Sequence, residues 1–206
     1  AHWDDEPFEA IVSNPPYSIK WDGDANPLLI NDPRFAPAGV LAPKSKADLA
    51  FTMHMLSWLA VNGTAAIVEF PGVLYRGGAE QKIRKYLIDN NYVDAVIQLP
   101  PDLFFGTTIA TCIIVLKKSK RDNAVLFIDA SAEFVRQGNK NKLTDANQAT
   151  ILDTYTQRAD ADHIVRLVDN EAIAENGYNI AVSSYVDAKD TREATDITAL
   201  NAEIAR

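Results

Sequence analysis

Short apolar runs alternate with longer amphipathic segments over the first 130 residues of the chain. A continuous apolar run is typical of a strand covered on both faces of a sheet, whereas apolar positions three and four residues apart are typical of a packed helix. Strands separated by helices indicate an α/β fold with a mostly parallel sheet. The predicted strands are residues 8–13, 65–70, 93–99, 109–116 and 124–129, and the predicted helices are 45–61 and 79–90.

Two connections qualify this pattern. The link between the strands at 93–99 and 109–116 is short enough for an antiparallel pair, which we place at the edge of the sheet. Residues 18–44 hold several prolines and glycines and are predicted to form a long loop, a kind of segment that is usually functional in a compact domain. Ser45 and Asp48 resemble a capping box at the start of the next helix.

The character of the chain changes after residue 143. A helix is predicted at 144–158, followed by mixed short elements to Val186 and a polar tail. Residues 144–206 carry 12 acidic and 5 basic residues, a net charge of −7, whereas residues 1–143 carry 16 and 15, a net of −1. We therefore predict a division into residues 1–143 and an acidic, mixed or helical region, 144–206, that contacts other subunits.

The formal charge of −8 over 206 residues argues at first against a nucleic-acid partner, because phosphate binding favours a basic surface. The charge is unevenly distributed, however, and residues 76–142 carry 11 basic and 7 acidic residues, a net of +4. Lys117, Lys118, Lys120 and Arg121 form the densest basic cluster. Two interpretations of it stay open: a solvated strand end, or part of a surface that faces nucleic acid.

Several classes of site have no support in the sequence. The single Cys112 lies in an apolar strand, which excludes a disulfide scaffold and indicates a small core residue and a reducing compartment. His2, His54 and His163 have no ligand spacing, so no metal site is expected. No apolar run reaches membrane-spanning length and no secretory leader is present, which favours a cytoplasmic protein without membrane contact. The nine glycines include no G-x-G pair.

Asn14-Pro15-Pro16-Tyr17 carries the strongest chemical signal, because it directly follows a predicted buried strand. The carboxyl ends of strands in an open α/β sheet are where ligands bind. The amide oxygen of Asn14 and the carbonyl of Pro15, fixed by the following proline, offer two rigid acceptors for an amino group with two protons. Tyr17 adds a face on which a heterocycle can stack. The competing interpretation is a proline-rich turn with an asparagine cap.

Such acceptors suit a poorly nucleophilic aromatic amine such as that of adenine. Holding both of its protons favours a pyramidal nitrogen and stabilises the positive charge that develops as the nitrogen attacks a methyl group. An adenine in duplex DNA has to leave the base stack to reach such a site, and a stacking aromatic ring offsets part of that cost.

The sequence resembles the modification subunit of type I restriction-modification systems, which are adenine-specific DNA methyltransferases dependent on S-adenosylmethionine. The resemblance runs from about residue 7 to about residue 186. The tetrapeptide alone is shared with RNA-adenine and protein-glutamine methyltransferases, so the wider motifs carry the specificity. They are FEAIVSNPPYSIKW at 8–21, FAPAGVLAPKSKADLAF at 35–51, YRGGAEQKIR at 75–84 and LFFGTTIAT at 103–111.

The resemblance implies a role for each matching position. Asn14 and the Pro15 carbonyl would hold the adenine amino group, Pro16 would rigidify the turn, and Tyr17 would stack on the flipped base. Phe104 or Phe105 matches the second aromatic contact of the family, and we expect Phe105. The implied fold is the catalytic half of a Rossmann-like methyltransferase sheet plus a mixed or helical C-terminal region, with residues 1–143 forming the C-terminal part of the catalytic domain.

The chain departs from the family pattern in one respect. The glycine-rich loop and ribose-binding acid that hold S-adenosylmethionine precede the tetrapeptide in this family, and only 13 residues precede Asn14 here. We therefore interpret the chain as a fragment lacking the N-terminal cofactor-binding half, with cofactor contacts expected mainly upstream of Ala1. We expect this piece alone neither to bind S-adenosylmethionine tightly nor to methylate DNA.

The implied partners are DNA, a specificity subunit, a restriction subunit and a second copy of the modification subunit. Two alternative functions stay open. One is a structural or assembly fragment that acts only through subunit contacts. The other is an RNA-adenine or protein-glutamine methyltransferase, against which the long loop at 18–44 and the long region after residue 129 count.

Overall fold

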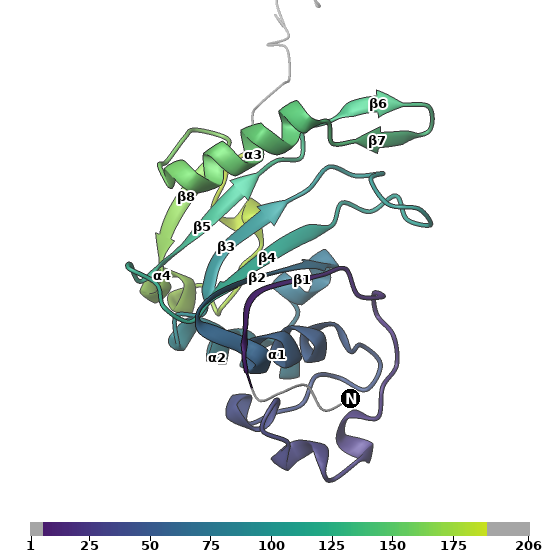
Figure 1. Ribbon diagram of the computed structural model, residues 1–206, viewed down its shortest axis with the longest axis vertical. Coiled ribbons are helices and arrows are strands. Elements are labelled where there is room, and N and C mark those ends of the chain that lie inside the picture. Colours follow the sequence, from purple (N-terminus) through teal and green to yellow (C-terminus); the bar gives the residue numbers. More distant parts are fainter. Residues whose placement is uncertain (1–5, 189–206) are drawn as a thin grey trace, which may run out of the picture.

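Six strands form one sheet in the order β1–β2–β4–β3–β5–β8 (Figure 1). The computed structural model describes residues 6–188. β1, β2, β3 and β5 run in one direction, and β4 and β8 run against them, so the sheet is mixed with most of its strands parallel. The strands are β1 Phe8–Ser13, β2 Leu59–Glu69, β3 Val93–Gln98, β4 Cys112–Lys117, β5 Ala124–Asp129 and β8 Val165–Asp169.

The position of β4 corrects the predicted edge hairpin. β3 and β4 do form an antiparallel pair, as their short link indicates, but β4 also pairs with β2 along its other side. The strand therefore lies inside the sheet. The sequence of β4 explains this position, because it is apolar and its residues Cys112, Ile114 and Leu116 are completely buried. At an edge, a strand of this composition would expose unpaired backbone groups and apolar surface.

Two helices cover one face of the sheet. α1 (Asp48–Trp58) and α2 (Ala79–Asp89) follow β1 and β2 along the chain and lie below the sheet in Figure 1. Their apolar side chains form the larger core cluster with Ile67, Val96 and Phe127 of the sheet. The helix predicted at 45–61 is shorter than expected at both ends, and β2 begins immediately after it.

Asn62 and Gly63, which directly follow the helix predicted at 45–61 and would mark its end, lie within β2. The early start of β2 lets Leu59 pair with Phe8, and the register between the two strands shifts before Ala10 meets Thr64. A Cβ atom at Gly63 would lie 2.9 Å from the carbonyl oxygen of Phe8. Glycine is therefore required at this position by the close approach of β1 and not by a helix end.

The other face of the sheet is only partly covered. α3 (Asp145–Gln157) lies across it above β5 and β3 and packs Ile151 and Tyr155 into a second apolar cluster (Figure 1). Thr144 caps this helix in a capping box with Asn147, which confirms the helix predicted at 144–158. Toward β1 the face stays open, and Val12 is 85% exposed.

The region after α3 returns to the sheet. β8 pairs with β5, and α4 (Asn170–Glu175) is followed by a segment that places Ile180, Val182 and Val186 in the larger core cluster. The division at residue 143 remains a prediction. Part of the region after it belongs to the same sheet and core as the residues before it. The polar tail from residue 189 lies outside the described residues.

A second, two-stranded sheet was not predicted from the sequence. It is the hairpin of β6 (Val135–Gln137) and β7 (Lys140–Lys142). Short 3₁₀ turns occur within the predicted loop at 18–44, at the end of β2 and near the C-terminal end of the described region, at Gly23–Ala25, Leu29–Asn31, Ala36–Ala38, Pro71–Leu74 and Val182–Ser184. No helix within residues 6–188 is long and apolar enough to cross a membrane.

Candidate functional site

Asn14-Pro15-Pro16-Tyr17 follows β1 at the carboxyl end of the parallel strands, as predicted. The expectation that this strand is buried was wrong, because β1 lies at the edge of the described sheet and most of its residues are exposed. Pro15 is buried, Asn14 and Pro16 are exposed, and Tyr17 is half-buried. The Tyr17 hydroxyl donates a hydrogen bond of 2.9 Å to Oδ1 of Asn14. An amide oxygen has two lone pairs, so Asn14 can accept a second hydrogen from a ligand while Tyr17 holds its side chain in place.

The backbone after the motif is tied to the start of α1. Ser18 has a φ of +51° and donates its backbone N–H to Oδ1 of Asp48, at 2.9 Å. Asp48 therefore does not form the predicted capping box with Ser45: α1 begins at Asp48, and its N-cap residue Ala47 has no side-chain cap. The carboxylate fixes the motif instead, across 30 residues of sequence.

A buried glutamate lies at the carboxyl end of β2, beside β1. Glu69 is fully buried, its Oε1 accepts a 2.8 Å hydrogen bond from the Thr52 hydroxyl, and its Oε2 has no hydrogen-bond partner among residues 6–188. Burial raises the pKa of Glu69 to about 8, and the carboxylates of Asp48 and Glu80 contribute to the rise. The Tyr17 hydroxyl also has a raised pKa, first through burial and then through Glu69. The motif thus rests against a carboxyl group that stays protonated at neutral pH.

This buried carboxyl predicts a pH-dependent stability. Between the ordinary pKa of 4.5 and about 8, Glu69 is protonated in the folded state and ionised in the unfolded state. The folded protein binds the extra proton, so the free energy of unfolding should fall as pH rises through this window, by about 1.4 kcal/mol per pH unit. Glu69→Gln should lack this component, and chemical denaturation from about pH 5 to about pH 8 measures it.

The exposed Glu171 on α4 supplies the control. Glu171→Gln should follow the pH profile of the unmodified protein, because the substitution leaves the buried Glu69 in place. Parallel profiles for Glu69→Gln and the unmodified protein would show that Glu69 ionises freely in the fold.

The loop with the two phenylalanines leaves the same edge of the sheet. Phe105 is 101% exposed, whereas Phe104 packs against the second apolar cluster. Because β1 and β3 are parallel and two strands lie between them, their ends are about 14 Å apart, at roughly 4.8 Å per strand. Of the two rings, Phe104 anchors the loop, and only Phe105 is free to meet a ligand above the sheet edge. Its contact with a base remains a prediction.

A cavity of about 360 Å³ opens beside Asn14 on the uncovered face of the sheet. Its volume falls in the range of small-ligand sites. Val12, Ser13, Asn14, Ala66, Val68 and Ile113 line it. The wall is apolar apart from Ser13 and Asn14, so a planar heterocycle would meet apolar surface with the Asn14 amide at the rim.

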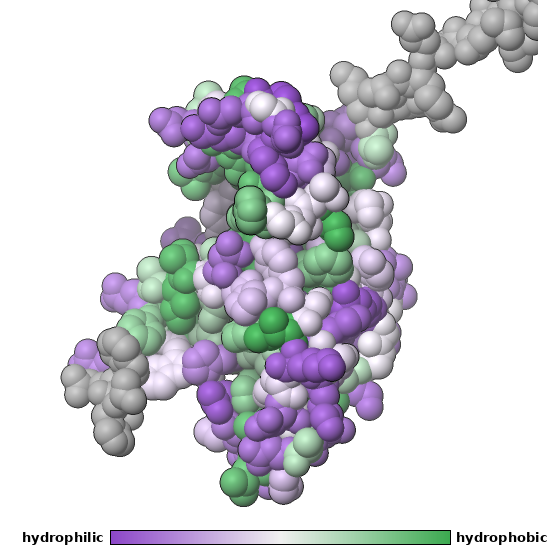
Figure 2. Space-filling view, turned by 90° about the vertical axis from the view of Figure 1, so that its right-hand side faces the viewer, coloured by the Kyte–Doolittle hydropathy of each residue, from purple (hydrophilic) through white to green (hydrophobic). Residues whose placement is uncertain are grey.

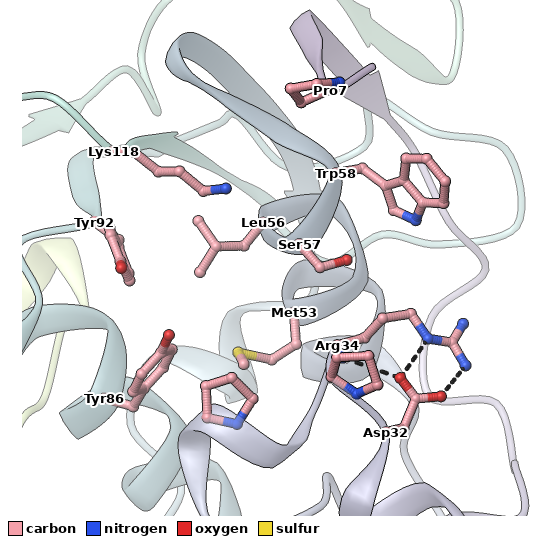
Figure 3. Close-up of a pocket in the computed structure, with 12 residues that line it drawn as sticks. Pro7, Asp32, Arg34, Met53, Leu56, Ser57, Trp58, Tyr86, Tyr92 and Lys118 are labelled. Carbon is pink, nitrogen blue, oxygen red and sulfur yellow. Dashed lines mark hydrogen bonds and ion pairs between the residues drawn. The ribbon is translucent and has the colours of Figure 1, made fainter. Parts of the chain in front are cut away.

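A cavity of about 670 Å³ lies at the opposite end of the sheet. It is lined by Trp58, Tyr92 and Lys118, which adjoin the amino ends of β2 and β3 and the carboxyl end of the antiparallel β4. Figure 3 shows Lys118 and Tyr92 on one side and Arg34, paired with Asp32 at 2.6 Å, on the other. No residue of the tetrapeptide or the phenylalanine loop lines it, so it is separate from the candidate site.

The basic cluster at 117–121 lies at that same opposite end, and its lysines have structural partners. Lys117 pairs with Asp94, Lys118 donates to the carbonyl of Leu59, and Lys120 is almost completely buried. Arg121 is exposed. These lysines hold strand ends together at the end of the sheet away from the tetrapeptide, which favours the interpretation of the cluster as a strand end.

The sequence contains no G-x-G pair, and no glycine directly follows a strand at the carboxyl edge near Asn14. Within residues 6–188, no three His, Cys, Asp or Glu side chains cluster as a metal site would require. Cys112 is fully buried, and burial raises the pKa of its thiol, as expected for a core residue.

The class of protein follows from a strand-end Asn-Pro-Pro-Tyr on this mixed sheet and from comparison with known families. The chain belongs to the N-6 DNA methylase family, whose model matches residues 1–194.

Among individual proteins, it is 50% identical over 198 residues to the type I restriction enzyme MpnII methylase subunit of Mycoplasma pneumoniae, covering 96% of this chain and 36% of the relative. The MjaVII methylase subunit of Methanocaldococcus jannaschii is 34% identical over 199 residues, which cover 90% of this chain and 34% of that protein.

The crystal structure of the type I restriction-modification methyltransferase subunit from Streptococcus thermophilus superposes with a TM-score of 0.87 at 46% identity. The match covers 91% of this chain and 40% of that one. The chain therefore spans about a third of the length of the curated relatives described above.

Proposed function

We propose that this chain supplies the base-binding half of an adenine-specific DNA methyltransferase, the modification subunit of a type I restriction-modification complex. The observation that carries the proposal is the placement of Asn14 at the carboxyl end of β1, with its amide oxygen held by Tyr17 and a cavity opening beside it. Phe105, exposed on the loop after β3, stands at the same edge of the sheet.

The residues of the chain act on the amino group and the ring of the base. Asn14 Oδ1 and the Pro15 carbonyl accept the two amino hydrogens, which favours a pyramidal nitrogen and stabilises its growing positive charge. Tyr17 stacks on the ring, and Phe105 contacts it from the loop. S-adenosylmethionine supplies the electrophilic methyl group. We expect the residues that hold it to lie mainly upstream of Ala1.

The proposed setting is a cytoplasmic complex with DNA, a specificity subunit, a restriction subunit and a second modification subunit. The mostly paired lysines at 117–121 do not face DNA near the site. We therefore assign most phosphate contacts to partner subunits. The specificity subunit would read the target sequence, because recognition here needs only a flipped adenine.

The experiment compares acceptors for tritiated methyl groups. The full-length protein, assembled with its specificity subunit, should label duplex DNA containing adenine at its target site. It should leave RNA of the same sequence and glutamine peptides unlabelled. Labelling of RNA or peptide alone would assign the tetrapeptide to the alternative methyltransferase classes. Absence of labelling on every acceptor, with an intact complex, would favour the assembly role.

A further inference from the structure

The exposed Phe105 sits between two backbone carbonyls that are held by one lysine. Nζ of Lys140, on β7, donates to the carbonyl oxygen of Phe104 at 2.9 Å and to that of Thr107 at 3.1 Å. The loop between these carbonyls contains only Phe105 and Gly106, and Gly106 has a φ of +80°. The ammonium therefore spans the tip of the loop and leaves the Phe105 ring outside the contact.

The same hairpin also holds the base of the loop. The side chain of Asn141 is buried and donates to the Pro101 carbonyl at 2.8 Å, while its backbone N–H donates to the carbonyl of Asp102 at 3.1 Å. Arg136 on β6 donates to the Asp102 carboxylate and to Oδ1 of Asn141. The β6–β7 hairpin thus holds both the start and the tip of the loop that leaves β3.

Apolar packing does not explain the position of the hairpin. β6 is exposed along its whole length, and the hairpin adds little apolar burial, since its strands are Val-Arg-Gln and Lys-Asn-Lys. Figure 2 shows that hydrophilic side chains gather at the top of the face onto which the site opens, over this hairpin. Its contacts with the loop are polar and directed at backbone groups.

We propose that Lys140 is a positioning residue that sets the place of the Phe105 ring for capture of the flipped base, with the β6–β7 hairpin as its support. This inference rests on the proposed function and deepens it. A fully exposed ring beside a glycine has no packing of its own, so an unsupported tip would be ordered only when the base binds. Fixing the carbonyls on either side avoids that loss of conformational entropy at the moment of binding.

The test compares Lys140→Met with Lys142→Met in the full-length protein assembled with its specificity subunit. Lys142 is an exposed lysine on the same strand, and its side chain makes no ion pair or hydrogen bond with residues 6–188. Two hydrogen bonds from a charged donor are lost in Lys140→Met, so kcat/KM for methyl transfer should fall about tenfold. The fluorescence of 2-aminopurine at the target position, which reports the flipped base, should fall in parallel.

Further readouts separate positioning from other roles. Cleavage by chymotrypsin after Phe105 should become faster in Lys140→Met, because the loop tip is no longer held, and stay unchanged in Lys142→Met. The Kd for DNA should change less than about twofold in both variants, since the lost bonds are within the protein. Lys140→Arg, which keeps a charged donor, should recover most of the flipping signal. If Lys140→Met does not fold, Lys140→Gln carries the same measurements.

A double variant decides whether Lys140 acts through Phe105. Phe105→Ala should lower flipping and activity, and adding Lys140→Met should make neither much worse, because the two changes remove one function. If Phe105→Ala lowers both and Lys140→Met changes neither, the positioning role is overturned and the proposed function stands. If Phe105→Ala has no effect, the proposed role of Phe105 fails first. A loss of DNA affinity in Lys140→Met with unchanged cleavage of the loop would identify a phosphate contact and also overturn the inference.

Discussion

Replacing Asn14 with alanine in the full-length protein is expected to lower kcat for methyl transfer by about 10²–10³-fold. Asn14 offers its amide oxygen where positive charge develops on the attacking nitrogen, and removal of one such preorganised group from an active site costs about this much. The residue is exposed at a strand end and bonds only to Tyr17 within the described region, so the fold should survive the change. Single-turnover transfer to target DNA measures the effect.

Asn62→Ala is the matched control for this prediction. Asn62 is also an exposed asparagine, but it lies in the amino-terminal part of β2, away from the site. Its replacement should leave kcat within about twofold of the unmodified value. Full activity in Asn14→Ala, with an unchanged melting temperature, would remove Asn14 from the catalytic machinery.

Replacing Lys120 with methionine is expected to lower the free energy of unfolding by about 3 kcal/mol. The side chain of Lys120 is 1% exposed, and its ammonium donates to Asn91 Oδ1, the Val93 carbonyl and the Ala124 carbonyl, at 2.8, 2.7 and 2.5 Å. Burial lowers the pKa of Lys120 to about 8, so the group still carries its proton at neutral pH. Methionine fills similar space but removes the charged donor from all three acceptors, of which Asn91 Oδ1 keeps a second donor in the Asn170 amide. Denaturant unfolding at pH 7 measures the loss.

The neighbouring Arg121 provides the comparison, because it carries the same charge but is exposed. Arg121→Met should change stability by no more than about 0.5 kcal/mol. Equal losses from the two substitutions would mean that the net charge of the segment matters and the buried hydrogen bonds do not. Below its unfolding transition, Lys120→Met should also keep its DNA affinity, since this end of the sheet faces away from the site.

Strands and helices were predicted from the sequence where the residues of one short segment determine the element by themselves. The runs at 93–99 and 124–129 are apolar on both faces and form buried strands, and Thr144 marks the start of α3 by its own side chain. The place of β4 in the sheet depends on its pairing with β2 as well as with β3. The sequence of β4 and its neighbours does not indicate this second partner. The β6–β7 hairpin was missed because its short, polar strands have no apolar alternation.

The same distinction holds for the site. The tetrapeptide could be placed at a strand end because the apolar run and the prolines are adjacent in sequence. Asp48 and Lys140 act through contacts 30 and 33 or more residues away, so neither could be recognised from spacing. A weak signal existed for Glu69, an acidic residue at the end of an apolar strand, but its burial depends on how α1 packs over it.

The contacts of Lys140 and Asn141 fix the backbone of the phenylalanine loop without involving the side chain of residue 105 at its tip. Lys140 holds carbonyl groups, which every amino acid possesses, and Asn141 likewise donates to backbone carbonyls, those of Pro101 and Asp102. The identity of residue 105 is therefore not part of the anchor, provided that Gly106 keeps its φ of +80°. If residue 105 were replaced by each other amino acid in turn, the backbone of the loop should keep its conformation. The loop therefore offers one position at which base preference can be engineered by side-chain identity alone.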